Sequence, residues 1–425
     1  MPYLRSRRSV VSTFAVMFAL LLNAVSVGLA QSKPQKGDPG TGTGKANSRP
    51  KSMTEEERLK AEADKKRAEE EKNAVVEDIV EKIETNVVSV DAVVYNKKTG
   101  QIITGLKKAN FAIFENGVKQ NISNFATPDM PITVSLVVEY SKWTEVFGSA
   151  AGGQFEPGAY EVIKPVAYFL QKFIKPPNDY ASLIAFDIRP TPITDFTNDP
   201  ARLSAAVNIL FRNSPAFREN NLWDALKFTL LGGRGDTVVL DDSKDKYADY
   251  AGMVDLKAKR RAIILVASGI DTFSRINFDQ IRRIIQEAGV PIYVISTGNL
   301  FYKKYEQFLP ALDDIAATGL PGRLTFLQAQ SAMTTIAKES GGVHYPMTFE
   351  GEVPGYLNQI NALLRNQYSL GYDIAEKHEP GKKYKLEVKV DVDGDGVYDD
   401  KVYVVQHRPF YVTPKTPEKA PVKKK

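Results

Sequence analysis

The sequence has no cysteine and three histidines, His344, His378 and His407, which lie far apart along the chain. The absence of Cys excludes a thiol nucleophile, a zinc–thiolate site and a disulfide framework. Common catalytic motifs are missing too, since there is no Gly-x-Ser-x-Gly elbow, no His-Glu-x-x-His pair and no dinucleotide fingerprint. We therefore expect that the protein is not an enzyme.

The excess of basic residues is concentrated at the ends of the chain. The 425 residues carry a formal net charge of +5, yet the body between residues 85 and 412 is close to neutral. Binding to nucleic acid needs a basic face that neutralises phosphates. We therefore expect no nucleic-acid partner.

Residues 1–30 have the composition of a secretory signal peptide. Arg5, Arg7 and Arg8 precede an apolar run from Val10 to Val27, and small residues follow at Gly28–Ala30. This order of basic, apolar and small residues is typical of a cleaved signal. We predict export to the periplasm, the outer envelope or the medium, with no membrane span after cleavage.

Three further segments lack the composition of a folded core. Residues 31–52 are rich in Gly, Pro, Lys, Ser and Thr, which predicts a flexible linker, and residues 413–425 read as a disordered Pro/Lys tail. Residues 53–84 are highly charged and predict a solvated helix that begins with a capping box at Thr54 and Glu57. The end of that helix carries an apolar stripe, which is expected to dock on the following domain or to bind a partner.

The middle of the chain alternates apolar strands with amphipathic helices. Strands are expected at 132–138, 181–186, 190–196, 261–267, 291–296 and 343–345, and helices at 159–174, 200–211, 222–231, 278–288 and 329–340. This alternation predicts an α/β fold with a doubly wound, mostly parallel six-stranded sheet over residues 130–365. Ligands of such sheets bind at the carboxyl ends of the strands, here near Glu139, Asp187 and Ser268.

Two β-rich segments flank this middle part. Strands are expected at 86–95, 102–106, 111–115 and 118–125, and again at 367–374, 385–391 and 401–406. Asn116-Gly117 is a strong hairpin signal. A single hairpin is too small to be stable alone. We therefore predict that 85–129 and 366–412 form one small β domain into which the α/β domain is inserted.

Six motifs occur along the chain in a characteristic order. They are LKKANFAIFENGVKQNISNF, PITVSLVVEYS, NLWDALKF, AIILVASGIDTFS, LLRNQYSLGYD and RPFYV. In this order they resemble the bacterial exported proteins that carry a von Willebrand factor A-related domain, the acidobacterial branch above all. The resemblance covers roughly residues 86 to 412. It implies a von Willebrand A-like domain that binds proteins through the carboxyl-end face of its sheet.

The resemblance also implies a degenerate metal-ion-dependent adhesion site. In the family, an Asp-x-Ser-x-Ser loop, a Thr and a further Asp surround one Mg²⁺. The matching positions here are Glu139, Ser141, Trp143, Asn220, Ser268 and Asp271. Four of the five expected ligands are changed, and Trp143 supplies no oxygen. Because Mg²⁺ needs near-octahedral oxygen ligands, we predict that the site has lost the metal or binds Mg²⁺ weakly.

Trp143 allows two interpretations. With Tyr140 and Lys142 it is positioned after the first strand of the sheet, where an exposed Trp beside a cation would anchor a protein partner. Alternatively, the indole fills the vacated metal cavity as part of the core. Substituting Trp143→Ala separates the two, through partner binding in the first case and melting temperature in the second.

Residues 391–399 resemble a calcium loop. Asp391, Asp393, Asp395 and Asp399 occupy positions 1, 3, 5 and 9, and a glycine occupies position 6. Position 12, which normally holds a bidentate acid, is Val402. A hairpin turn rich in Asp and Gly explains the same residues. The sequence leaves both a Ca²⁺ site and a turn open.

Two hypotheses of function follow from these observations. The first is an exported, non-catalytic module that binds proteins, and the alternative is a structural or assembly factor of the cell envelope. Arg234-Gly235-Asp236 has the sequence of an integrin-recognition tripeptide. Because tripeptides often occur by chance, we expect this match to be a coincidence. It lies in a polar insertion, 232–257, whose length indicates a functional or disordered loop.

Overall fold

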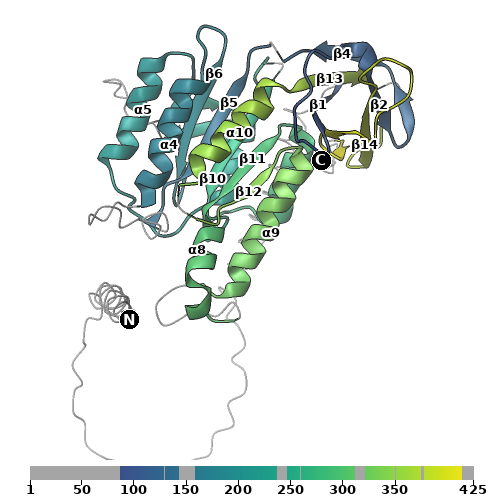
Figure 1. Cartoon of the computed structure of the whole chain (residues 1–425). Coiled ribbons are helices and arrows are strands. Elements are labelled where there is room, and N and C mark those ends of the chain that lie inside the picture. The colour runs from purple at the N-terminus through teal and green to yellow at the C-terminus, as the bar shows by residue number, and fades with distance from the viewer. Residues whose placement is uncertain are drawn as a thin grey trace, which may run out of the picture.

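A computed structural model describes residues 87–128, 130–142, 158–236, 247–258, 260–311, 321–349, 351–374 and 378–413 (Figure 1). The predicted signal peptide, linker and charged helix lie outside these residues, and so does the predicted C-terminal tail except for its first residue, Thr413, which is buried and hydrogen-bonded. Within the described part of the chain, no helix has both the length and the apolar character needed to cross a membrane.

A six-stranded sheet forms the centre of the α/β part. Its order is β12-β11-β10-β5-β6-β7, and all neighbours are parallel except β6 and β7. The strands are β5 (Thr133–Glu139), β6 (Tyr180–Phe186), β7 (Pro190–Thr197), β10 (Arg261–Ala267), β11 (Ile292–Ser296) and β12 (His344–Pro346). This confirms the predicted mostly parallel six-stranded sheet.

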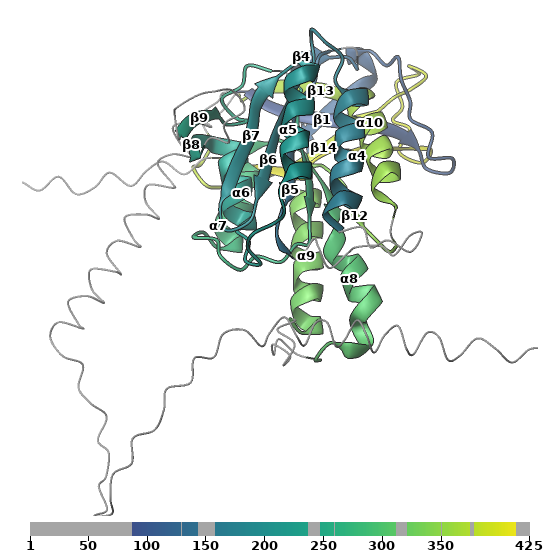
Figure 2. The same cartoon turned by 90° about the vertical axis from the view of Figure 1, so that its left-hand side faces the viewer.

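Helices cover both faces of this sheet (Figure 2). On one face lie α4 (Gly158–Phe173), α5 (Pro200–Arg212) and α10 (Val353–Arg365), and on the other α6 (Leu222–Leu231), α7 (Phe278–Ala288) and α9 (Arg323–Ser340). In β5, Leu136 packs into the first core and Val137 into the second. Because both faces are covered, the central strands β5 and β10 are buried along nearly their whole length and are mostly apolar rather than alternating.

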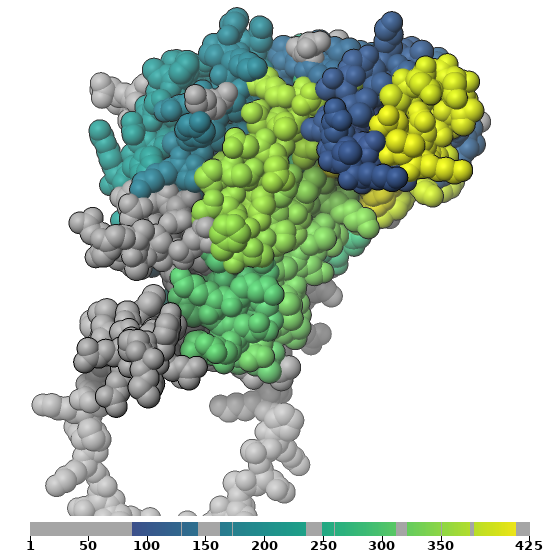
Figure 3. All heavy atoms as spheres, in the orientation of Figure 1, coloured from purple at the N-terminus to yellow at the C-terminus, as the bar shows by residue number. Residues whose placement is uncertain are grey.

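Two four-stranded antiparallel sheets enclose a third core. Their orders are β15-β1-β13-β4 and β16-β14-β2-β3. The strands are β1 (Val87–Asn96), β2 (Phe111–Glu115), β3 (Val118–Gln120), β4 (Ile122–Ala126), β13 (Tyr368–Asp373), β14 (Lys383–Val390), β15 (Tyr403–Gln406) and β16 (Phe410–Val412). Every N-terminal strand except β3 pairs with a C-terminal one, and Figure 3 shows the two ends of the described chain side by side. The exact domain limits stay predictions.

The β part is packed directly against the α/β part. Arg260 donates from Nη1 to the carbonyl oxygens of Pro128 and Met130, both at 2.8 Å, on the segment that joins β4 to β5. Gly341, at φ +90°, approaches Arg408 so closely that an added Cβ would lie 2.8 Å from the Arg408 backbone nitrogen. A larger residue at 341 would therefore force the two parts away from each other.

Two helices extend beyond the carboxyl edge of the sheet. They are α8 (Thr297–Tyr305), which follows β11 directly, and the first half of α9; a short 3-10 turn, Glu306–Phe308, follows α8. In Figures 1 and 2 this arm points away from the two antiparallel sheets. Phe301, Leu309 and Phe326 give the arm a small core of its own.

The structure corrects several sequence predictions. Helices α8 and α10 were not expected. Helix α8 has only nine residues, so its periodic signal is weak, whereas Val353, Leu357, Ile360 and Leu364 of α10 do follow helical spacing and the sequence prediction did not include them. The strand predicted at 102–106 is reduced to one bridge between Tyr95 and Ile102. The insertion at 232–257 includes a hairpin of β8 (Gly232–Asp236) and β9 (Tyr247–Ala251) rather than only loop. The Arg-Gly-Asp tripeptide therefore lies in a paired strand.

Candidate functional site

Glu139 ends β5 at the carboxyl edge of the sheet and is 2% exposed. Its Oε1 accepts hydrogen bonds from the Ser141 hydroxyl (2.7 Å) and from the Asn220 amide nitrogen (3.0 Å). Its Oε2 accepts from the backbone N–H of Ser268 (2.6 Å). Four of the positions expected from the sequence therefore meet in one network, which we name the Glu139 network: Glu139, Ser141, Asn220 and Ser268.

This network is poorly suited to Mg²⁺. Both oxygens of its only carboxylate already accept bonds from protein donors. The Ser268 hydroxyl oxygen accepts from the N–H of Ile270 at 3.2 Å, and Asn220 Oδ1 is buried without a hydrogen-bond partner. One acceptor of that kind does not replace the charged, octahedral set of oxygens that Mg²⁺ requires. The residues present fit a closed hydrogen-bonded network better than a metal site.

Asp271 lies outside this network. Its Oδ1 accepts from the Ser274 hydroxyl (2.5 Å) and from the backbone N–H of Trp223 (3.4 Å), in the first turn of α6. Burial, supported by the nearby Asp224, raises the pKa of Asp271 to about 6. Asp224 in turn accepts from the N–H of Arg275 (3.0 Å), so two carboxylates hold the 271–276 loop to α6.

The loop after β5 differs from the predicted surface. The Tyr140 hydroxyl donates to the carbonyl oxygens of Leu210 (2.7 Å) and Asn213, so this half-buried ring fastens the end of α5. Tyr140 is thus a structural residue and not an exposed anchor. Lys142 is exposed, as expected. Trp143 lies outside the described residues, so both interpretations of it stay open.

Exposed phenylalanines gather around the carboxyl edge instead. Within the described ranges, Phe217 (45%), Phe273 (59%), Phe308 (51%) and Phe349 (63%) are the exposed members of that residue type. They lie before α6, after β10, on the arm that follows β11, and after β12. Loop phenylalanines have no periodicity, so sequence patterns did not indicate them. Their common location appears only when the strand ends meet.

Backbone hydrogen bonds connect two of these phenylalanines, Phe217 and Phe273, to residues in or next to the Glu139 network. The N–H of Phe273 donates to the carbonyl oxygen of Asn220 at 2.8 Å, and the side chain of the same Asn220 bonds Glu139. The N–H of Lys142, just after Ser141, donates to the carbonyl oxygen of Phe217 at 2.8 Å. The buried carboxylate therefore fixes the loops that present both rings.

The second expected site lies in the turn between β14 and β15. Carboxylate oxygens of Asp391, Asp393 and Asp395 lie within 4.8 Å of one another. The Asp391 oxygens accept from the N–H groups of Gly394 (2.7 Å) and Gly396 (2.9 Å). Burial raises the pKa of Asp391, but the backbone bonds from these glycines and a side-chain hydrogen bond with Asp393 outweigh burial and lower it. Asp399 accepts from the N–H of Val392 at 2.8 Å and does not belong to the three-carboxylate group.

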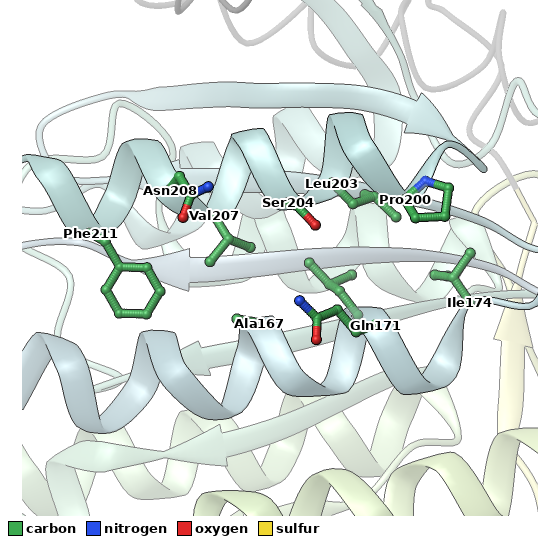
Figure 4. A pocket seen from close by; sticks show the side chains of 10 residues that line it. Ala167, Gln171, Ile174, Pro200, Leu203, Ser204, Val207, Asn208 and Phe211 are labelled. Carbon is green, nitrogen blue, oxygen red and sulfur yellow. The ribbon is translucent and has the colours of Figure 1, made fainter.

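A groove of about 190 Å³ runs between α4 and α5 (Figure 4). Its floor is apolar, with Leu170, Leu203 and Val207, and Gln171 and Asn208 lie along its sides. None of the lining side chains is acidic or basic. The groove therefore offers shape and amide groups but no acid–base chemistry.

No family model matches the chain, and no curated protein matches its sequence. Among solved structures, the chain is similar to proximal thread matrix protein 1 from the mussel byssus, with a TM-score of 0.37 and 11% identity over 59% of this chain and 50% of that one. It is also similar to the conserved hypothetical protein BatB from Bacteroides thetaiotaomicron, with a TM-score of 0.34 and 10% identity over 55% and 97% of the chains. A third is the vWF domain of the type V pili tip protein Mfa5 from Porphyromonas gingivalis, with a TM-score of 0.35 and 13% identity over 56% and 95%. The chain thus spans half the length of the mussel protein, and all three likenesses are remote.

Proposed function

We propose that the protein is an exported, non-catalytic module that binds another protein through the carboxyl-end face of its von Willebrand A-like domain. The observation that carries this proposal is the location of the exposed phenylalanines at that edge. Exposed aromatic side chains held on fixed loops are typical anchors of protein interfaces. The partner would present apolar pockets to Phe217 and Phe273.

In this proposal the Glu139 network replaces the metal ion of the related domains. A metal site there would recruit a partner carboxylate, whereas the closed network supports the loops that hold Phe217 and Phe273. Binding would then be independent of divalent cations. The degenerate adhesion site predicted from the sequence would then support binding without a metal ion.

The alternative function is a structural or assembly factor of the envelope, in which the α/β domain is a scaffold. Crosslinking in the native organism distinguishes the two. A photoreactive phenylalanine analogue replaces Phe273 in one variant and Val397, which is 66% exposed in the turn before β15, in a matched control. The proposal requires a discrete adduct from position 273 that position 397 does not give. If only position 397 gave adducts, the result would favour the alternative function, in which the α/β domain is a scaffold.

We further propose that the 391–399 turn binds Ca²⁺ weakly. The supporting observation is the convergence of three carboxylates, of which Asp393 and Asp395 are exposed and each accept one backbone bond on Oδ1. Ca²⁺ accepts flexible oxygen ligands and completes its shell with water. Its role would be to stabilise the β14–β15 connection, apart from partner binding.

A further inference from the structure

A second group of metal-ligating side chains lies between the two antiparallel sheets. Glu115, at the end of β2, is 8% exposed. Its Oε2 accepts hydrogen bonds from the hydroxyl groups of Tyr411 (2.9 Å) and Tyr372, and its Oε1 lies 2.6 Å from Nε2 of His378. These four residues, which we name the Glu115 cluster, come from β2, β13, β16 and the segment before β14.

The cluster is compact and still reachable from solvent. Tyr372 and Tyr411 are 1% and 6% exposed, while the side chains of His378 and Glu115 keep 11% and 10%. Ligands about 2.0–2.1 Å from a small cation in an octahedral site lie about 2.9 Å apart. The Tyr411–Glu115 oxygen separation of 2.9 Å is that of an ordinary hydrogen bond and is also compatible with this spacing. An ion could therefore replace the shared protons with small shifts of the side chains.

The types of donor atom in the Glu115 cluster indicate which metal ion it would bind. Three hard oxygens and one imidazole nitrogen converge, and deprotonation of both phenols would give three negative charges with the carboxylate. Ca²⁺ and Mg²⁺ select carboxylates, carbonyls and water, and protein zinc sites use Cys, His, Asp and Glu. Tyrosine, in contrast, does ligate iron in proteins, as it does the haem iron of catalase. A trivalent hard cation balances this donor set.

We infer that the Glu115 cluster binds one ferric ion, with Tyr372, Tyr411, Glu115 and His378 as its protein ligands. Binding exchanges the two phenol protons for the ion and involves no change of oxidation state. This inference is independent of the function proposed for the other end of the molecule.

Visible spectroscopy tests it on the purified full-length chain, with ferric nitrilotriacetate as the iron source. Iron bound to phenolate gives a charge-transfer band in the visible region, which should saturate at one equivalent. Tyr411→Phe and Glu115→Gln should each weaken iron binding about tenfold or more, as loss of a ligand or its support does. Tyr384→Phe is the matched control, because that ring lies 4.1 Å from His378 but its hydroxyl bonds the Glu379 N–H and not Glu115.

Two results would overturn the inference. One is the absence of a visible band from the wild-type chain, a measurement that does not depend on the folding of any variant. The other is a band that Tyr372→Phe and Tyr411→Phe both leave unchanged while circular dichroism shows a native fold. A band lost in Asp393→Asn but kept in both tyrosine variants would place the iron in the 391–399 turn and would also refute it.

Discussion

The carboxylate of Glu139 accepts a hydrogen bond from the backbone N–H of Ser268 at 2.6 Å, although 129 residues separate the two along the chain. Strands β5 and β10 are parallel neighbours, so their carboxyl ends meet. The position expected for a metal-binding Asp is thus occupied by a serine whose backbone satisfies the buried acid.

Removal of the Glu139 carboxylate should destabilise the protein, and this loss of stability should not depend on whether Mg²⁺ or Mn²⁺ is present. Glu139→Ala removes the acceptor that the donors of Ser141, Asn220 and Ser268 share, and we expect a loss of about 2–5 kcal/mol in the free energy of unfolding. Chemical denaturation measures this loss. Mg²⁺ and Mn²⁺ should leave the melting temperature of the wild-type chain unchanged. Micromolar Mg²⁺ binding by calorimetry, abolished in Glu139→Ala, would contradict the closed network.

Asp271 should make the protein less stable as the pH rises. Its pKa is raised from 3.8 in the unfolded chain to about 6 in the folded one, so its stabilising contribution is complete below pH 4 and is lost as the pH passes 6. Asp271→Asn keeps an acceptor for Trp223 and Ser274 but cannot ionise. The variant should gain about 1–2 kcal/mol over wild type at pH 8, and little at pH 4. Equal differences at both pH values would rule out this effect.

Asp179 should have the opposite pH dependence. Burial opposes its ionisation, but hydrogen bonds from Arg365 (2.5 Å) and from the N–H of Ile132 (3.0 Å) outweigh burial and lower its pKa. Its stabilising contribution is therefore present above pH 4 and is lost as the pH falls below that value. We expect Asp179→Asn to cost about 2–4 kcal/mol at pH 7 and less near pH 3, measured by urea unfolding at each pH. A cost that grows on acidification would be incompatible with a lowered pKa.

Calcium should stabilise the β14–β15 turn. Millimolar Ca²⁺ is expected to raise the melting temperature by a few degrees relative to chelator, because a ligand that binds only the folded state adds to its stability. Asp393→Asn should remove the shift, whereas Asp400→Asn, whose carboxylate lies outside the three-carboxylate group and 3.1 Å from Lys389 Nζ, should retain it. If Ca²⁺ has no effect on wild type, the segment is a turn only.

Much of the α/β core could be predicted from local pattern. The runs at 132–138 and 261–267 are mostly apolar, apart from Thr133 and Ser135 in the first and Arg261 at the start of the second. Such runs are typical of an element buried on all sides, and both are strands of the sheet. Helix α7 was predicted at its observed limits, because Asn277 caps its start and Gly289, in the left-handed region, ends it. These signals involve neighbours within a few residues, so the sequence displays them directly.

The hydrogen-bond partners of the polar residues were decided by the tertiary structure. The sequence by itself determined that Glu139 and Ser268 lie at the ends of predicted strands and Asn220 just before a predicted helix. Only the order of the strands in the sheet brought the atoms of these three residues into one network. The same holds for the exposed phenylalanines and for Glu115, whose tyrosine partners in β13 and β16 lie more than 250 residues away. A hydrogen bond depends on the geometry of two distant segments within a fraction of an ångström, and local periodicity carries no information about which distant segments meet.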